Sequence, residues 1–457
     1  MAARSVRIGS GMGFYGDSIY PSLDLAVRGD VQYIAFDDLA ELTLAILEKE
    51  RARDPHAGYT RDIGPLMRLL LPETHRRGIR LLTNAGGLNP DGAREEVARV
   101  ARELGIRLRV AVVRGDDVRP RLDALRGAGA DLRHMDDGRP LADVADRLVF
   151  ANVYLGCMPI VRALEEGAEV VITGRTTDAA QFAAPLVHEF GWRADDWDRM
   201  AAATVVGHLL ECGGQVSGGN FSGDWWNLPD MDRLGYPIAE VAEDGTAVIQ
   251  KAPGTGGRVS ADTVKEQLLY EMHDPARYLT PDVVVDVTRV RLEDVGPDQV
   301  RVTGARGRPR PETLKLLMGY QDGYLGEGLM GYAWPDALSK ARMADGIVRR
   351  QIARMGIEAQ EIHTSYLGYD SLHGALAREV DEDLLNEVYL RIAVRTRTRA
   401  EAGKLGRLFP PLALDGPPFI GGLAGMRPVR ELLGLWPALV DRQLIEPHVE
   451  VDVQEVG

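Results

Sequence analysis

The chain is poor in cysteine and histidine, and it contains no long apolar run. Two cysteines in 457 residues, Cys157 and Cys212, cannot build a disulfide framework or hold an iron–sulfur cluster unaided. The nine histidines are scattered singly, which argues against a histidine-rich metal centre. Because no apolar run approaches about 18 residues, we expect neither a transmembrane helix nor a membrane partner.

Positive charge is also scarce, since the formal net charge is −14. Nucleic acids and anionic membranes bind through basic surfaces, so we expect no nucleic-acid partner. The first residues, MAARSVRIGSGMGFYGDS, enter a strand-like run without an apolar signal core, and we expect a soluble, cytoplasmic protein. The hydrophobic content of 45% and charged content of 27% are ordinary for a globular protein of two domains.

The first 190 residues alternate β-branched apolar runs with amphipathic helical stretches. Continuous apolar strands separated by helices predict a mainly parallel sheet covered by helices on both faces. We therefore expect α/β architecture, with an open sheet favoured over a closed barrel. The expected strands are 5–10, 31–38, 79–87, 107–117, 148–154 and 168–175, and the expected helices include 39–54, 91–105 and 158–167.

The pattern changes after about residue 285. Two strand candidates, 281–295 and 298–307, follow each other with no helix between them. A smaller α+β module is predicted to follow, so we divide the chain into an α/β domain, 1–285, and an α+β domain, 286–457. The module has expected strands at 314–321, 360–370 and 386–398 and an expected helix at 336–356.

Polar and glycine residues follow several of the expected strands. Each of them has an ordinary explanation as a helix cap or a turn residue. Taken together they predict a pocket at the carboxyl ends of the strands, where open α/β sheets bind ligands. Such a pocket would suit a small anionic substrate. The residues are Asp17, Asp37, Asp38, Asn84, Gly86, Gly87, Arg175 and Asp178.

Two glycine-rich stretches resemble nucleotide loops only superficially. GSGMGFYG, from Gly9, has no acidic residue at a strand end about 20 positions on, so a dinucleotide site is not expected. PGTGGRVSAD, which contains Gly256 and Gly257, lacks the G-K-[ST] ending of a phosphate loop. Its amides can form an anion-binding nest before a helix, and turn chemistry explains it equally well.

The stretch GHLLECGGQVSGGNF ends a predicted helix over 195–214. Cys212 lies in its last turn beside Glu211, where both the helix dipole and that carboxylate oppose a thiolate, so we expect a packing role. His208 and Glu211 share a helix face, as an acid/base pair, half of a metal site or a hydrogen-bonded pair beside the core. The loop that follows is expected to contact a ligand through Gln215, Ser217 and Asn220.

A series of these stretches resembles the acyclic terpene utilisation family, the AtuA-like proteins. The resemblance departs from the family pattern at Asp38, where an aromatic residue is expected, and at ECGGQVSGG, which varies ECGAQ. The matching stretches cover roughly residues 5–290 and read GFYGDS, FDDLAELTLAILEK, TNAGGLNP, ANVYLGCMPIVRAL, VITGRTTDAA, LVHEFGW, GHLLECGGQVSGGNF, YPIAEV and KAPGTGGRVSADTVKEQLLYEMHDPARYLTPDV.

The resemblance implies acyl-CoA or branched-carboxylate catabolism, because the family is named for gene clusters that degrade citronellol and geraniol through CoA thioesters. It also implies a small partner protein, which is fused to some members. It identifies no catalytic residues and no reaction.

We weigh three hypotheses. The first is a lyase or hydro-lyase whose bases are Asp37, Asp178 or the His208–Glu211 pair, with Arg175 and the glycine-loop amides as anchors for the oxyanion and for a substrate carboxylate. The second is an amide or thioester hydrolase that uses a divalent metal bound by Asp17, Asp37 and Asp38. The third is a non-catalytic subunit that binds a CoA ester and works with the small partner. A homo-oligomer is expected from the size of the chain.

Overall fold

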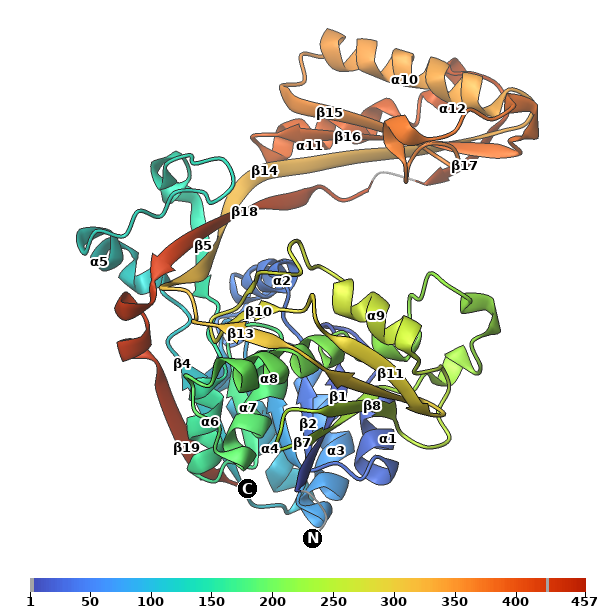
Figure 1. Ribbon diagram of the computed structural model, residues 1–457. Helices are drawn as coiled ribbons and strands as arrows, with labels where there is room; N and C mark the ends of the chain where they lie inside the picture. Colours follow the sequence, from blue (N-terminus) through green and yellow to red (C-terminus); the bar gives the residue numbers. More distant parts are fainter. Residues whose placement is uncertain (1–3, 425–426) are drawn as a thin grey trace. The chain divides into compact units, whose positions relative to one another are not determined.

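A ten-stranded open sheet is the largest sheet in the computed structural model, which describes residues 4–424 and 427–457 (Figure 1). Its middle strands are parallel, and the strands on both sides of them are antiparallel. Across the sheet the order is β11 (Arg291–Gly296), β12 (Gln299–Thr303), β8 (Ala247–Lys251), β7 (Pro237–Ala242), β1 (Ser5–Met12), β2 (Tyr33–Phe36), β3 (Arg80–Thr83), β6 (Val170–Thr173), β4 (Leu108–Arg114) and β19 (Glu450–Val456).

The sheet is mixed, so the expectation of a mainly parallel sheet holds only for β1, β2, β3, β6 and β4. Strands β7 and β8, and likewise β11 and β12, are joined by short turns. A short turn can connect only antiparallel neighbours, because a parallel pair needs a crossover of a dozen or more residues. The expected strand at 148–154, β5 (Leu148–Val153), leaves this sheet and pairs with β14 (Thr313–Ala333).

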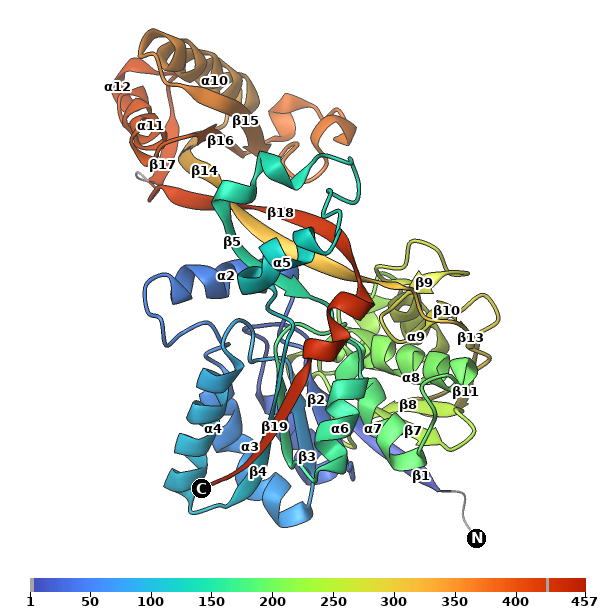
Figure 2. The same cartoon turned by 90° about the vertical axis from the view of Figure 1, so that its left-hand side faces the viewer.

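Helices cover both faces of the sheet, as the sequence predicted (Figure 2). The apolar cluster between sheet and helices includes Phe36, Met67, Leu81, Val97 and Val170, all almost completely buried. On one face lie α1 (Tyr20–Arg28), α3 (Ile63–Arg77) and α4 (Pro90–Leu104), and on the other lie α6 (Met158–Glu165), α7 (Ala180–Phe190) and α8 (Trp197–Leu210).

The chain leaves the neighbouring strands β3 and β6 in opposite directions. From β3 it passes through α4 to β4, whereas from β6 it passes through α7 and α8 to β7 on the far side of β1. Such a reversal is a topological switch point, and open α/β sheets bind ligands beyond the carboxyl ends of the strands there. The order of the strands therefore places a candidate site beside the ends of β3 and β6.

Several further elements lie outside the ten-stranded sheet. A three-stranded sheet has the order β13-β10-β9. The elements outside the ten-stranded sheet are α2 (Glu41–Arg51), α5 (Leu122–Gly127), α9 (Ala261–Leu269), β9 (Tyr278–Leu279), β10 (Val284–Asp286) and β13 (Arg306–Arg308).

Within the described residues, no helix combines the length and apolarity that crossing a bilayer requires.

The contacts within the chain divide it into two compact units, residues 1–318 with 435–457, and residues 319–434. The second unit contains a sheet of order β15-β16-β14-β17, and α10 shares an apolar cluster with it that includes Leu338 and Val348 of the helix and Ile392 of β16. Its elements are α10 (Ala337–Arg354), β15 (Ala359–Leu367), β16 (Glu387–Thr396), α11 (Arg399–Leu405), α12 (Leu412–Asp415), β17 (Ile420–Ala424) and the start of β18 (Arg430–Asp441). The predicted domain limits, 1–285 and 286–457, stay a prediction.

Trp436, on β18, is the largest of the completely buried side chains, and its indole N–H donates to the Leu132 carbonyl (3.1 Å). We expect Trp436→Ala to lower the free energy of unfolding by about 3–5 kcal/mol, because the truncation leaves a cavity. Urea unfolding followed by circular dichroism measures this change. Trp226→Ala is the matched control, since Trp226 is 66% exposed and its truncation leaves no cavity. Equal effects of the two substitutions would contradict the burial of Trp436.

Candidate active site

Polar side chains from neighbouring strands meet at the switch point. Asp37 and Asp38 follow β2, and Asn84 follows β3. The Asn84 amide donates to Asp37 Oδ1 (2.6 Å), and its carbonyl oxygen accepts from the backbone N–H of Asp38 (2.6 Å). Thr83 donates its hydroxyl to Asp38 Oδ2 (2.8 Å). All of these side chains are at most 7% exposed, so the predicted strand-end residues form one buried network.

Arg175, in the loop after β6, places a guanidinium in the interior of the protein. Its Nη1 donates to Asp178 Oδ1 (2.7 Å) and to the Leu39 carbonyl (2.5 Å). The guanidinium also lies over the ring of Tyr154, with Cζ 4.1 Å from the ring centroid. The charge of Arg175 is thus compensated by Asp178, whose side chain, 32% exposed, connects the site to the surface.

A second ion pair, formed by Glu41 and Lys315, lies beside Tyr154. The Tyr154 hydroxyl donates to Glu41 Oε1 (2.5 Å), and Lys315 donates to the same oxygen (3.0 Å). Burial raises the pKa of Glu41, but the Tyr154 hydrogen bond and the charges of Arg175 and Lys315 lower it to about 2. Glu41 is therefore ionised and balances Lys315. Nothing in the apolar strand pattern around residue 315 signals this contact.

His208 and Glu211 form the hydrogen-bonded pair that their spacing on one helix face predicted. His208 Nδ1 lies 2.8 Å from Glu211 Oε1, and both side chains are buried. Gly207 allows α8 to approach the start of α7, because a Cβ at that position would lie 2.6 Å from Ala179. The helix thereby brings the pair close enough to Asp178 for that carboxylate to affect the pKa values of both.

Burial and mutual repulsion keep protons on this cluster at neutral pH. Burial raises the pKa of Asp37 well above its usual range, and the Asp178 and Glu211 carboxylates add to this effect. Burial likewise raises the pKa of Glu211 to about 7, although His208 acts to lower it. For His208, burial lowers the pKa but the Glu211 carboxylate raises it overall. The cluster can therefore donate and accept protons near pH 7.

Several buried polar atoms around the cluster have no hydrogen-bond partner within the described part of the chain. They are Arg175 Nε, His208 Nε2, Glu211 Oε2 and Gln267 Oε1. Gln267 belongs to the same region, because its Nε2 donates to the His208 carbonyl (2.8 Å). Buried polar groups are normally satisfied, so unpaired donors and acceptors on one cluster indicate that a ligand or water completes them.

Asp116, which the sequence analysis did not single out, fixes the loop that carries Arg175. Its Oδ2 accepts from the Arg175 backbone N–H (2.7 Å) and from the Asn152 amide (2.8 Å). A Cβ at Gly174 would lie 2.3 Å from the same oxygen, so glycine is required there. Burial raises the pKa of Asp116 to about 6. The signal was present in the sequence, since Asp116 follows strand β4 as Asp37 follows β2.

The predicted residues Asp17, Gly86 and Gly87 shape the turns around the cluster. Asp17 accepts from the backbone N–H of Gly13 (2.9 Å) and from the Tyr236 hydroxyl (2.5 Å), which occupies both carboxylate oxygens. Gly87 adopts a φ of 52° and donates its N–H to the Asn84 carbonyl (3.1 Å). A Cβ at Gly86 would lie 2.5 Å from the Thr173 carbonyl, so glycine permits the ends of β3 and β6 to approach each other.

The loop after α8 packs against the second glycine-rich stretch. Gly256 and Gly257 donate their N–H groups to the carbonyls of Arg233 (2.8 Å) and Pro229 (2.7 Å), so these amides are already used within the backbone. Ser217 is buried and its hydroxyl has no partner among the described residues, whereas Gln215 is half-buried and Asn220 is exposed. A ligand role for these five residues stays a prediction.

Cys212 has the environment expected of a packing residue. Burial raises the pKa of its thiol well above the usual range, and the Glu211 carboxylate raises it further. Gly13 packs against the same turn, because a Cβ there would lie 2.6 Å from the Cys212 carbonyl carbon. Helix α8 ends at Leu210, so Cys212 lies just beyond its last turn and not within it, and Gly213, with a φ of 55°, begins the short 3-10 helix Gly213–Ser217. A thiol in this setting is a poor nucleophile.

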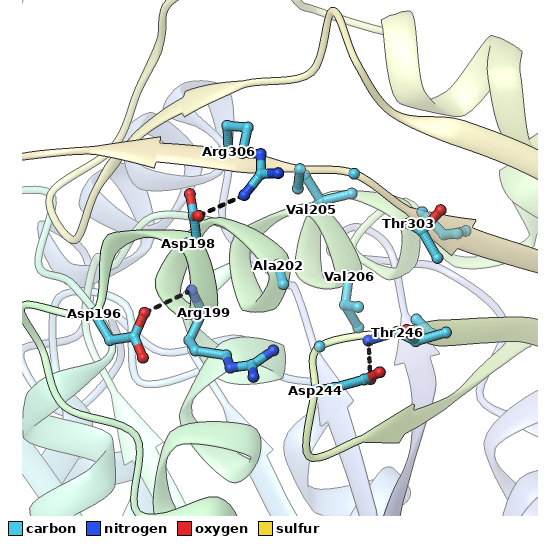
Figure 3. A pocket seen from close by; sticks show the side chains of 15 residues that line it. Asp196, Asp198, Arg199, Ala202, Val205, Val206, Asp244, Thr246, Thr303 and Arg306 are labelled. Carbon is cyan, nitrogen blue, oxygen red and sulfur yellow. Dashed lines mark hydrogen bonds and ion pairs between the residues drawn. The ribbon is translucent and has the colours of Figure 1, made fainter.

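A hollow of about 420 Å³ lies along α8, from Asp196 at the start of the helix to Val206 near its end (Figure 3). The acidic residues of the hollow have structural partners: Asp196 accepts from the Arg199 N–H, Asp198 pairs with Arg306 and Asp244 accepts from the Thr246 N–H. None of the cluster residues Asp37, Arg175, His208 and Glu211 lines this hollow.

No three His, Cys, Asp or Glu side chains converge as a metal-binding group within residues 4–424 and 427–457. In particular, both oxygens of Asp17 accept hydrogen bonds, and one oxygen of Asp38 accepts from Thr83. Both oxygens of Asp17, and one oxygen each of Asp37 and Asp38, thus already accept hydrogen bonds from the protein.

Comparison with known proteins gives one match. A family model described as "Acyclic terpene utilisation family protein AtuA" matches residues 6–451, nearly the whole chain. No curated protein and no solved structure matches it. The matched range contains every residue of the cluster and the whole of the unit 319–434.

Asp38 makes the stability of the protein depend on pH. Burial raises its pKa to about 7, Thr83 lowers it, and Asp62 and Asp17 raise it. An unfolded Asp titrates near pH 4, so between about pH 4 and 7 only the folded state binds this proton, and stability falls as pH rises. Asp38→Asn removes this titration. We expect the free energy of unfolding of the variant, relative to wild type, to increase by about 2 kcal/mol from pH 5 to pH 8.

Urea unfolding of both proteins at pH 5 and pH 8 measures the difference in their free energies of unfolding. Groups that titrate equally in the two proteins do not contribute to this difference. Asp123→Asn is the control, because the Asp123 side chain is fully exposed. A difference between Asp38→Asn and wild type that does not change with pH would show that Asp38 is not protonated in the folded protein.

Proposed function

The chain belongs to the acyclic terpene utilisation family, and from that premise we propose that it is a catabolic lyase or hydro-lyase acting on an acyl-CoA ester or a branched or dicarboxylic acid. Family membership indicates a function related to terpene utilisation. The observation that carries the proposal is the buried cluster at the switch point, where Asp178 pairs with the guanidinium of Arg175 (2.7 Å) and its charge also acts on Asp37 and on the hydrogen-bonded pair of His208 and Glu211. Acid–base catalysis at a carbon next to a carbonyl requires this combination.

The proposed reaction assigns one task to each group. Asp178, whose side chain is 32% exposed, removes the proton from the carbon next to the carbonyl, and the electrons of that C–H bond pass into the carbonyl. The Nε of Arg175 donates to the oxygen on which negative charge develops. The His208–Glu211 pair then gives its proton to the leaving hydroxyl at the next carbon. The carbon–oxygen bond breaks, water leaves and a carbon–carbon double bond remains.

The pKa values suit these tasks. A general acid works best when its pKa lies near the operating pH, and Glu211 titrates at about 7. Burial raises the pKa of Asp37, which Asn84 holds in place, so its protonated form can add a second hydrogen bond to the carbonyl oxygen. Asp116 contributes indirectly, because it fixes the backbone of Arg175 and so the direction of the guanidinium.

A thermal-shift panel tests the proposed substrate class. We expect CoA esters of branched acids to raise the unfolding midpoint, because a ligand that binds only the folded state stabilises it by mass action, by about 2.7 kcal/mol at 100 times its Kd. The panel includes the matching free acids, CoA alone, and Mg²⁺, Mn²⁺ and Zn²⁺ singly, with and without chelator. A rise that requires a metal would replace the lyase by the metal-assisted hydrolase, and no rise with any organic ligand would overturn the proposal.

Substitution of the proposed base and acid tests the mechanism on the substrate that the panel identifies. We expect Asp178→Asn and Glu211→Gln each to lower kcat by about 10²–10⁴-fold, the usual contribution of a positioned acid or base. Ligand-induced stabilisation persists in both variants, which shows that the site still forms. Asp123→Asn, remote from the cluster and fully exposed, is the control. Undiminished turnover by Asp178→Asn would remove that residue from the role of base.

A further inference from the structure

Every cationic side chain of the cluster already has a carboxylate of its own. Arg175 Nη1 lies 2.7 Å from Asp178 Oδ1, and Lys315 Nζ lies 3.0 Å from Glu41 Oε1. His208, when protonated, has Glu211 at 2.8 Å. The positive charges that could attract an anion are therefore compensated within the protein.

One carboxyl group is left over after this pairing. Among the described residues, Asp37 has no cationic partner in direct contact, and its carboxyl group accepts a hydrogen bond from the neutral amide of Asn84 (2.6 Å). The cluster therefore has more carboxyl groups than basic side chains, and each of its basic side chains already has a carboxyl partner. An additional anion would enter a buried site without a free cation, and burying an unpaired charge is strongly unfavourable.

The unpaired atoms of the cluster fit a neutral ligand. Arg175 Nε retains an N–H with no partner among the described residues, and this donor suits a carbonyl oxygen. The ring of Tyr154 lies against one face of the Arg175 guanidinium, and its Nη1 already donates hydrogen bonds to Leu39 and Asp178. Burial raises the pKa values of Asp37 and Glu211, which favours the protonated forms that can donate to the same kind of oxygen.

We infer that the group which enters this cluster is an uncharged carbonyl, as in a thioester or an amide, and that a free carboxylate is excluded from it. This inference rests on the proposed function and narrows its substrate class. It also changes the role predicted for Arg175, which becomes a hydrogen-bond donor to a neutral carbonyl rather than the anchor of an anionic group. A CoA ester satisfies the inference, since its phosphates are remote from its neutral thioester.

Two pairs of probes, matched in shape and different in charge, test the inference. Isobutyramide is compared with isobutyrate, and isobutyryl-CoA with methylmalonyl-CoA, in which a carboxylate replaces one methyl group. We expect the full-length protein at pH 7.5 to bind the uncharged member of each pair at least about tenfold more tightly, a difference of about 1.4 kcal/mol. Thermal shift and isothermal titration calorimetry measure the affinities.

The decisive variant removes a carboxylate that is paired with a cation. Asp178→Asn leaves the Arg175 guanidinium without its carboxylate partner. We therefore expect the variant to bind isobutyrate and methylmalonyl-CoA at least tenfold more tightly, without a matching gain for the uncharged probes. Glu41→Gln, which releases Lys315 in the same way, is the second variant in case the first does not fold. Asp123→Asn leaves the preference of the wild type unchanged.

The outcomes separate the inference from the proposed function. Equal or tighter binding of the charged probes by the wild type would overturn the inference and leave the proposed function standing. The same holds if neither folded variant gains affinity for the charged probes. If the wild type binds none of the four probes, the proposed function falls, and the inference falls with it.

Discussion

The burial of one guanidinium is the constraint on which the candidate site depends. Arg175 is almost completely removed from solvent, and an arginine cannot lose its charge to escape the cost of burial. Its compensation comes from several segments: Asp178 from its own loop, the Leu39 carbonyl after β2 and the Tyr154 ring after β5. Asp116 holds its backbone from the end of β4. The strand ends therefore cannot move independently, and the site is rigid because the charge must be balanced.

The reversal of the chain direction between β3 and β6 explains why these segments meet. Local sequence already pointed to the strand ends, because Asp37, Asn84 and Arg175 are polar residues that directly follow apolar runs. The parallel middle of the sheet and its two helical layers were predictable from periodicity. The antiparallel flanks were not anticipated, since an apolar run specifies a strand but not the direction of its neighbour. That direction follows from the length of the connection.

The unpredicted parts of the site depend on contacts distant in sequence. Lys315 lies in an apolar strand and reaches Glu41 only because β14 pairs with β5, a partnership that no local pattern reveals. The glycine-rich stretch also depends on contacts distant in sequence. Whether the N–H groups of Gly256 and Gly257 are free depends on the segment that packs against them, and the carbonyls of residues 229 and 233 accept from both. The His208–Glu211 pair was predictable because its geometry is set within a single helix.

Charge balance also connects the stability of the site to its chemistry. If each carboxylate had its own cation, all would be ionised at pH 7 and none could act as an acid. The excess carboxyl of Asp37, together with the burial of Glu211, keeps protons on the cluster and leaves it able to donate them. The same excess disfavours an anionic reacting group. Acid strength and the preference for a neutral carbonyl thus have one physical origin, the surplus of buried carboxyl groups over buried cations.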